Sequence, residues 1–292
     1  MKNYFIALDV GGSSIKSALV DNLGNVITNI SVRDSLANKD KNTILKNFIE
    51  IIEFHISEGE NLGVNIEKVG IAFPGPFDYE KGISLIRGIG KYESLYNINL
   101  KDELETLLPE LEFKFKNDAH LYALGECNFR EGKIFNKLLC ICIGTGIGSA
   151  FIENKSLLYE GENIPKEGWI YDKPFKGSIA DDYISTRGLL RIAEDNNIAI
   201  STGKELYELA CNNDKKALNV FKSFGKNLKE FMELYVKKCN IEAIVIGGNI
   251  SKAYEFFKED LERMCSDNNV TILISEDSTE STLIAVPMLF KK

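Results

Sequence analysis

The sequence predicts an α/β fold built from two lobes with a cleft between them. Segments with the patterns of strands and of helices alternate along all 292 residues, and roughly 100–200 residues per domain would make this two domains. Both halves begin alike, because a glycine-rich turn joins two apolar strands at residues 9–16 and again at residues 143–148. We therefore expect a duplicated fold with lobes at residues 1–118 and 119–277, and a terminal helix, about residues 278–292, that packs back on the first lobe.

Apolar patterning assigns the elements of the first half. Apolar runs separated by turns rich in Gly, Asp and Asn are typical of strands, and apolar residues spaced three and four apart are typical of a helix. The expected strands are residues 4–10, 15–20, 26–32, 68–73 and 112–116, and the expected helices are residues 43–56 and 100–108.

The second half shows the same patterns. Its clearest helix is 215–238, in which Phe221, Phe224 and Leu228 recur at spacings of three and four. The other expected helices are 119–129, 181–195, 251–265 and 278–290, and the expected strands are 138–143, 149–152, 243–246 and 270–274. Residues 160–180 are polar and predict a loop.

Composition argues against several classes of protein. Lysine and arginine number 35 against 43 aspartates and glutamates, and a formal charge of −8 argues against a non-specific nucleic-acid binder. The longest uncharged apolar stretch, residues 138–152, is shorter than the roughly 18–20 residues that span a bilayer, so we expect no membrane insertion. Six cysteines without a Cys-x-x-Cys pair give little support to a disulfide scaffold or a cysteine zinc site. We expect a reduced, cytoplasmic protein.

The first glycine-rich turn reads Asp-Val-Gly-Gly-Ser-Ser-Ile-Lys. Apolar residues that predict a strand follow it, so the turn belongs to a hairpin and not to a dinucleotide fingerprint, which needs a helix there. Gly11 and Gly12 let backbone N–H groups approach phosphate oxygens, and Ser13 and Lys16 are further donors. Asp9 is placed to hold Mg²⁺, directly or through water. The alternative is a plain β-hairpin without a ligand.

A second turn of the same kind lies between two apolar strands of the second half. Its candidate phosphate-binding residues are Gly144, Thr145, Gly146 and Gly148. Two such hairpins in one chain are more specific for a nucleotide than either hairpin alone. A third glycine pair, Gly247 and Gly248, joins a strand to a helix, so that backbone can pass close to a flat ligand such as adenine. For this pair the alternative is a short loop.

Phosphoryl transfer to an alcohol needs a carboxylate that accepts the hydroxyl proton. Asp118 is the best candidate, because it follows a strand and precedes a helix, where α/β proteins place ligand-facing residues. Asn117 can hydrogen-bond a second hydroxyl, although the alternative is that either residue only caps the helix. The two histidines, His55 and His120, are expected at a helix surface and in a structural role, so a Ser-His-Asp hydrolase is not supported.

Six motifs now occur in an order typical of one family. They are Asp9-x-Gly-Gly-Ser-x-x-Lys16, Phe73-Pro-Gly-Pro76, Asn117-Asp118-Ala119, Ala123-Leu-Gly-Glu126, Gly144-Thr-Gly-Ile-Gly148 and Ile246-Gly-Gly-Asn-Ile-Ser251. With them the chain resembles the ROK family of sugar kinases, within the actin-like and hexokinase-like ATPases, over residues 4–290. The resemblance implies an actin-like, ribonuclease H-like ATPase fold whose two lobes close on ATP, Mg²⁺ and a sugar.

The resemblance also implies roles for single residues. The γ-phosphoryl group of ATP would pass to a sugar hydroxyl, usually O6, with Asp118 as the general base and with Asn117 and Gly75 in the sugar site. The implied phosphate and adenosine sites comprise Asp9, Gly11, Gly12, Ser13, Lys16, Gly144, Thr145, Gly146, Gly148, Gly247 and Gly248. The implied partners are small molecules only, ATP and a sugar, and the implied assembly is a homodimer.

One stretch departs from the family pattern. Family members usually carry Glu-x-Gly-His after the second turn and then a cysteine-rich zinc loop, whereas this chain has Ile164-Pro-Lys-Glu-Gly-Trp-Ile170. No cysteine lies between Cys142 and Cys211, so we expect no structural zinc. Glu167 is a candidate sugar ligand, with a solvated loop residue as the alternative. Trp169 stands near the place of the histidine, where it would stack on the sugar or fill the position of the zinc loop.

The resemblance brings three functions into consideration. A sugar kinase acting on a hexose or an N-acetylhexosamine is favoured, with glucose and N-acetylmannosamine as the leading substrates. In the family pattern the histidine would contact sugar hydroxyls near C1 or C2. Its absence here weakly favours an N-acetylhexosamine, which carries a larger substituent at C2. A sugar-binding regulatory protein without kinase activity is the alternative. A DNA-binding repressor needs a helix-turn-helix before the first strand, which already begins near Tyr4, so this function is not expected.

Overall fold

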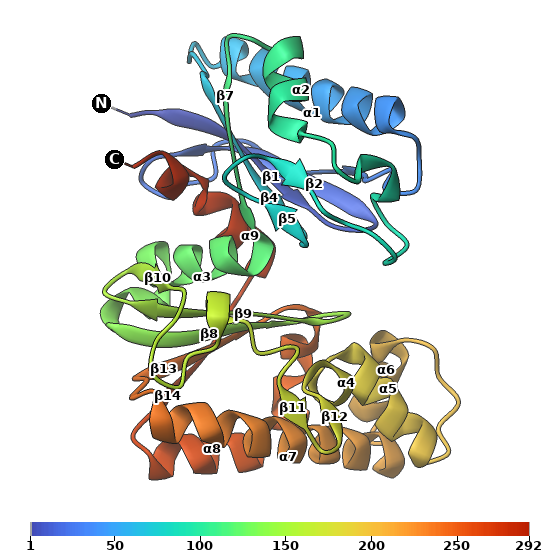
Figure 1. The fold of residues 1–292 in the computed structure, drawn as a ribbon. Helices are drawn as coiled ribbons and strands as arrows, with labels where there is room; N and C mark the ends of the chain where they lie inside the picture. The colour runs from blue at the N-terminus through green and yellow to red at the C-terminus, as the bar shows by residue number, and fades with distance from the viewer. Residues whose placement is uncertain (1, 292) are drawn as a thin grey trace. The chain divides into compact units, whose positions relative to one another are not determined.

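The computed structural model describes residues 2–291, which form two compact units. Unit 1 contains the described residues up to Phe129 and those from Thr279 onward, and unit 2 contains Arg130–Ser278 (Figure 1). The change of unit therefore comes after Phe129 and not after Asp118, where we expected it.

Packing of helix α3 (Asp118–Phe129) explains the later boundary. Gly125 of this helix lies so close to the backbone of Ser281, in helix α9 (Ser278–Ile284), that there is no room for a β-carbon. The hydroxyl of Ser281 also donates to a carboxylate oxygen of Glu126 at 2.8 Å. The C-terminal segment and α3 are thus held together inside unit 1.

Unit 1 is built on a five-stranded sheet with the order β3-β2-β1-β4-β7. Its strands are β1 (Tyr4–Val10), β2 (Ser14–Asp21), β3 (Ser31–Asp34), β4 (Lys68–Phe73) and β7 (Glu112–Asn117). β1 is antiparallel to β2 and parallel to β4, and β4 is parallel to β7. The carboxyl ends of β1, β4 and β7 therefore lie at one edge of the sheet. A small hairpin, β5 (Phe77–Asp78) with β6 (Ile83–Ser84), follows β4.

Helical segments cover both faces of this sheet. Helices α1 (Lys41–Asn61) and α2 (Leu100–Leu107) lie on one side (Figure 1), where Phe48 of α1 belongs to the same core as Ile71 of β4. Gly70 points to the opposite face because side chains alternate along a strand, and there Val286 of the short 3₁₀-helix η5 (Val286–Phe290) packs against it.

Unit 2 repeats the topology of unit 1. Its sheet has the order β10-β9-β8-β13-β14. The strands are β8 (Lys137–Ile143), β9 (Ile147–Glu153), β10 (Ser156–Leu158), β13 (Ala243–Gly247) and β14 (Thr271–Ile274). β8 is antiparallel to β9 and parallel to β13, and β13 is parallel to β14. The expected duplication of an α/β fold is confirmed by this repeated order.

Helix α7 (Lys215–Lys238) organises the core of unit 2, and its bounds are the expected ones. Phe221, Phe224 and Leu228 form its buried stripe. Beside it lies α8 (Lys258–Asp267) (Figure 1). The other elements are η2 (Glu131–Ile134), η3 (Lys166–Gly168), α4 (Asp181–Ile184), α5 (Thr186–Asp195), α6 (Gly203–Cys211), η4 (Asn249–Phe256) and the hairpin β11 (Pro174–Phe175) with β12 (Ser178–Ile179).

Three expected helices are interrupted. Ser185 is extended, and its side chain accepts from the N–H of Arg187, so it ends α4 and caps α5. Residues 251–265 divide into η4 and α8 because Phe257 leaves the helical conformation. The terminal helix ends at Ile284, and Pro287, which has no N–H to donate, lies at the start of η5.

Both histidines are buried, which corrects the expectation that His55 lies at a helix surface. His55 is fully buried against β2, where its Nε2 pairs with the hydroxyl of Ser17 at 2.8 Å and its Nδ1 with Glu58 at 2.7 Å. His120 is buried in α3. Within residues 2–291, no helix is both long and apolar enough to cross a membrane.

Candidate active site

The predicted site residues of unit 1 gather at the carboxyl edge of its sheet. The turn at Gly11–Ser13 follows β1, Gly75 follows β4, and Asn117 and Asp118 follow one another where β7 ends and α3 begins. Because β1, β4 and β7 are parallel neighbours, the topology alone brings these three segments together. In open α/β sheets this edge is where ligands bind.

Internal hydrogen bonds hold every carbonyl of the first turn. The hydroxyl of Tyr92 donates to the carbonyl of Gly11 at 2.8 Å. The hydroxyl of Ser35 donates to Gly12 at 2.8 Å, and the N–H of Ser35 donates to Ser13 at 3.1 Å. In the described part of the chain, the N–H groups of Gly12 and Ser13 have no protein acceptor, and both residues are exposed. This arrangement suits an anion such as phosphate.

Asp9 and Lys16 stand opposite each other across the β1–β2 hairpin. The ammonium of Lys16 donates to the hydroxyl of Thr279 at 2.6 Å, so the structure gives it an internal partner. Asp9 is half-buried one residue pair before the turn, and its carboxylate fits the single-carboxylate mode by which Mg²⁺ often binds beside substrate phosphates. Among residues 2–291, no group of three His, Cys, Asp or Glu side chains could hold a metal by itself.

Asn117 is buried and most of its amide is occupied. Its Oδ1 accepts from the N–H of Ala119 at 3.1 Å and of His120 at 3.2 Å, so it caps α3. Its Nδ2 donates to the hydroxyl of Tyr79 at 3.2 Å, and that hydroxyl donates to the carbonyl of Phe73 at 3.0 Å. The capping role left open by the sequence is therefore real, and the amide also acts on the neighbouring Asp118, where its hydrogen bond lowers the pKa of the carboxyl.

Tyr79 also joins Asn117 to the turn after β4. A β-carbon on Gly75 would lie 3.3 Å from the Tyr79 hydroxyl, so a larger residue at Gly75 would press on this contact. The sequence pattern contains no signal for Tyr79, which is brought here by the β5–β6 hairpin.

Asp118 keeps its carboxyl open to solvent at the start of α3. Protein atoms nevertheless surround it on its other sides, and this desolvation raises the pKa of Asp118 above the usual aspartate value. The N–H of Ala119, which donates to Oδ1 at 2.9 Å, and the positive charge of Lys91 act in the opposite direction. An exposed carboxylate with a raised pKa is suited to accept a proton from a bound hydroxyl.

The second turn is held in the same manner as the first. Both the N–H and the hydroxyl of Thr186, at the start of α5, donate to the carbonyl of Gly144 at 2.9 and 2.6 Å. The N–H of Ile147 donates to the buried carboxylate of Asp181 at 2.7 Å, and Arg187 pairs with that carboxylate. Thr145, at the tip, is exposed. No sequence motif singles out Asp181, because it lies 34 residues beyond its partner Ile147.

Gly247 and Gly248 lie beside the second turn. Gly247 ends β13 opposite Cys142 of β8, and Gly248 has a positive φ of 87°. The backbone of Ile143, which leads directly into Gly144, leaves no room for a β-carbon at Gly248. Glycine is thus required here for close packing as well as for its φ.

Glu167 adopts a left-handed conformation with φ of 59°, which is uncommon for a residue with a side chain. Gly168 after it also has a positive φ, and its carbonyl accepts from the buried hydroxyl of Ser149 on β9 at 2.7 Å. The same Ser149 oxygen accepts from the N–H of Ile170 at 3.0 Å. This anchoring holds Glu167 in place, and strained residues of this kind are concentrated at functional sites. Trp169 has a ring contact with Tyr171.

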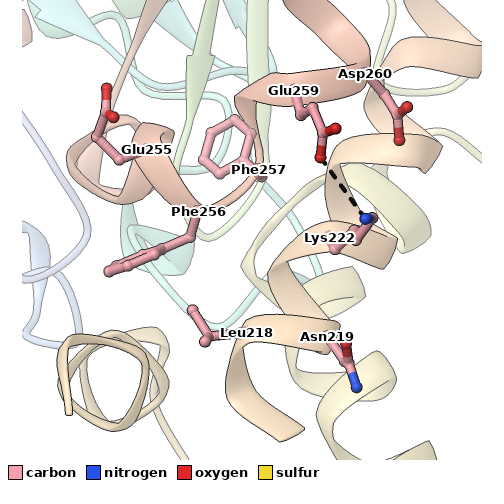
Figure 2. A pocket seen from close by; sticks show the side chains of 8 residues that line it. All are labelled: Leu218, Asn219, Lys222, Glu255, Phe256, Phe257, Glu259 and Asp260. Atoms are coloured by element: carbon pink, nitrogen blue, oxygen red, sulfur yellow. Dashed lines mark ion pairs between the residues drawn. The ribbon is translucent and has the colours of Figure 1, made fainter. Parts of the chain in front are cut away.

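A pocket of ≈ 250 Å³ lies elsewhere on unit 2, between α7 and η4 (Figure 2). Leu218 and Lys222 of α7 line it together with Phe256 of η4, and Lys222 pairs with Glu259 at 3.7 Å. None of its lining residues is one of the predicted site residues.

Comparison with known proteins gives a consistent result. The model of the ROK family matches residues 5–277. A glucokinase of Thermotoga maritima is 28% identical over 276 residues, which cover 86% of this chain and 83% of that protein.

Two solved structures are similar over nearly the whole chain. A glucokinase from Parabacteroides distasonis has a TM-score of 0.76 at 20% identity and covers 98% of this chain and 96% of its own. A ROK family glucokinase from Streptomyces griseus was solved in complex with glucose and AMPPNP. It has a TM-score of 0.78 at 18% identity, and the match covers 99% of this chain and 100% of that chain. The expected actin-like ATPase fold is confirmed.

Proposed function

We propose that this chain, which belongs to the ROK family, transfers the γ-phosphoryl group of ATP to the 6-hydroxyl of a hexose or an N-acetylhexosamine. It is a sugar kinase, as its relative is by the name glucokinase, and the AMPPNP in the Streptomyces griseus structure supports ATP as the phosphoryl donor. One observation carries the residue roles: a turn with outward N–H groups and the exposed carboxylate of Asp118 lie at the same edge of one sheet.

Asp118 is proposed as the general base. Its carboxylate accepts the proton of the sugar hydroxyl while that oxygen bonds to the γ-phosphorus and the bond from phosphorus to ADP breaks. The N–H groups of Gly12 and Ser13 and the turn at Gly144–Gly148 would bind phosphate oxygens, and Gly247–Gly248 the adenosine. Mg²⁺, when bound beside Asp9, would neutralise part of the phosphate charge.

The sugar side of the proposal rests on three residues. The amide of Asn117 would donate to a sugar hydroxyl, and Gly75 would shape the floor of the site. Glu167 would accept from hydroxyls, which its anchored, left-handed backbone supports. Trp169 stands near the place of the usual histidine, and the absence of that histidine weakly favours an N-acetylhexosamine as the substrate. The homodimer and the cytoplasmic location stay predictions.

ADP release from ATP and Mg²⁺ tests the proposal on a panel of glucose, mannose, N-acetylglucosamine and N-acetylmannosamine. At least one sugar should raise the rate well above the sugar-free rate, and phosphorus NMR should locate the product phosphate on O6. The 6-deoxy analogue of that sugar is the control, because it lacks the acceptor hydroxyl and should give no turnover. Sugar binding by calorimetry without ADP release would instead support the regulatory alternative.

A further inference from the structure

Lys91 lies on the first phosphate turn, although no sequence motif includes it. A β-carbon on Gly12 would lie 3.0 Å from Cδ and 3.8 Å from Nζ of Lys91. The side chain of Lys91 therefore occupies the space that the missing side chain of Gly12 leaves, with its ammonium at the turn. The charge of Lys91 also reaches the other reacting group, because it lowers the pKa of the Asp118 carboxyl.

Three hydrogen bonds to one carboxylate fix the loop that precedes Lys91. The N–H groups of Gly88, Ile89 and Gly90 all donate to the carboxylate of Glu93, at 3.0, 2.8 and 3.0 Å. Gly88 and Gly90 have positive φ values of 75° and 73°, a conformation that glycine adopts without strain.

The residue that follows Lys91 is anchored as firmly. Tyr92 is fully buried, its N–H donates to the carbonyl of Ala37 at 2.7 Å, and its hydroxyl donates to the carbonyl of Gly11. Its φ of 55° is unusual for a residue with a side chain. The backbone on both sides of Lys91 is therefore fixed relative to the phosphate turn.

The ammonium of Lys91 has no carboxylate within ion-pair distance in residues 2–291. By contrast, Lys41 in the same unit pairs with Glu103 at 2.8 Å. A half-buried cation that is held beside exposed N–H groups, without a carboxylate within ion-pair distance, is suited to bind an anionic ligand.

We propose that Lys91 is a catalytic residue that contacts the γ-phosphoryl group and stabilises its negative charge during transfer. This inference rests on the proposed kinase function. As the sugar oxygen bonds to the γ-phosphorus and the bond to ADP breaks, Asp118 takes the hydroxyl proton and Lys91 keeps its own proton throughout. Fixed cations of this kind act on the equatorial oxygens of the phosphoryl group.

Steady-state kinetics of Lys91→Met and Lys91→Arg test the inference on the sugar that the wild type phosphorylates. Loss of one preorganised charge donor should lower kcat by about 10²–10³-fold in Lys91→Met, with the sugar KM little changed, and arginine should restore part of the rate. Lys46→Met, which removes the same charge from the exposed face of α1, is the matched control and should retain the wild-type kcat.

The acid limb of the kcat/KM profile separates a charge effect from a structural one. Without Lys91, the pKa of Asp118 should rise, so the limb should move to higher pH in Lys91→Met and not in Lys46→Met. A folded Lys91→Met enzyme with a kcat within about threefold of wild type, or with only its sugar KM raised, would overturn the inference while the kinase function stands.

A wild type that releases no ADP with any sugar would instead mean that the proposed function fails. In that case, AMPPNP binding decides the role of Lys91. If Lys91→Met binds AMPPNP at least about fivefold more weakly than Lys46→Met does, Lys91 still contacts the phosphate groups. Equal affinities would reject that contact.

Discussion

Asp118 and Asn117 are adjacent in the chain but face different surroundings. The amide of Asn117 is turned inward, where it caps α3 and bonds Tyr79, whereas the carboxyl of Asp118 remains open to solvent. The uncharged residue of the pair thus makes most of the capping hydrogen bonds. This division leaves a carboxylate free to act on a ligand at the edge of the sheet.

Asp118→Asn should lower kcat by about 10²–10⁴-fold, because an amide cannot accept the hydroxyl proton. The fold should persist, since an asparagine oxygen can still accept from the N–H of Ala119. Asp195→Asn, an exposed change at the end of α5, is the matched control for the loss of one carboxylate and should leave kcat unchanged. Full activity in Asp118→Asn would reject the base assignment.

The pH profile provides a second measurement on Asp118. A base must be ionised, so kcat/KM should fall as pH falls through the pKa of Asp118. Because burial raises that pKa, the midpoint of this fall in kcat/KM should lie at a pH above the ordinary aspartate pKa of about 3.9.

Single residues within a motif could be predicted from the sequence, but their remote partners could not. Asp118 and both glycine-rich turns are recognisable because spacing along the chain reveals them. Tyr92 lies 81 residues from Gly11, whose carbonyl it holds, and no local pattern indicates that contact. Lys91 was missed for the same reason.

Whole elements were predictable where local patterning and burial agree. α7 and β4 have the expected bounds, since their apolar residues follow the periods of a helix and of a strand. The failures lie where one residue changes the local conformation, as Ser185 does between α4 and α5. The bound carbonyls of both turns likewise depend on donors from other elements, Tyr92 and Thr186, which periodicity does not reveal.

His55 couples α1 to β2 and makes stability depend on pH. Burial lowers the pKa of His55, and Arg33 acts in the same direction, while Glu58 raises it. The unfolded chain, with a histidine pKa of about 6.5, therefore binds the proton more readily than the folded chain. The free energy of unfolding should then fall as pH drops below about 6.5.

Urea unfolding at pH 7, 6 and 5 measures this dependence. His55→Gln should flatten it, at a cost of about 1 kcal/mol for a weakened hydrogen bond to Ser17. Glu58→Gln removes the carboxylate that favours protonated His55 and should steepen it. A wild-type slope that His55→Gln leaves unchanged would show that other groups control the dependence.

Aromatic packing holds the stretch of the chain in which the family resemblance would imply a zinc loop. Phe175 contacts Tyr183 and Phe231, with ring centroids 5.4 and 5.3 Å apart. Ile170 is fully buried, and the N–H of Ala180 donates to the carbonyl of Lys173 at 2.8 Å. These contacts tie the segment to α4 and α7 through apolar surface and backbone hydrogen bonds, which need no metal.

The stability of the chain should accordingly be independent of zinc. Metal analysis of the purified protein should find far less than one zinc per chain, and EDTA should leave the unfolding temperature unchanged. Phe175→Ala, by contrast, should lower that temperature and expose residues 160–180 to proteolysis, because truncating a packed aromatic ring costs up to about 3–5 kcal/mol. One zinc per chain, together with an EDTA-sensitive unfolding temperature, would show that a metal and not the aromatic cluster holds this segment.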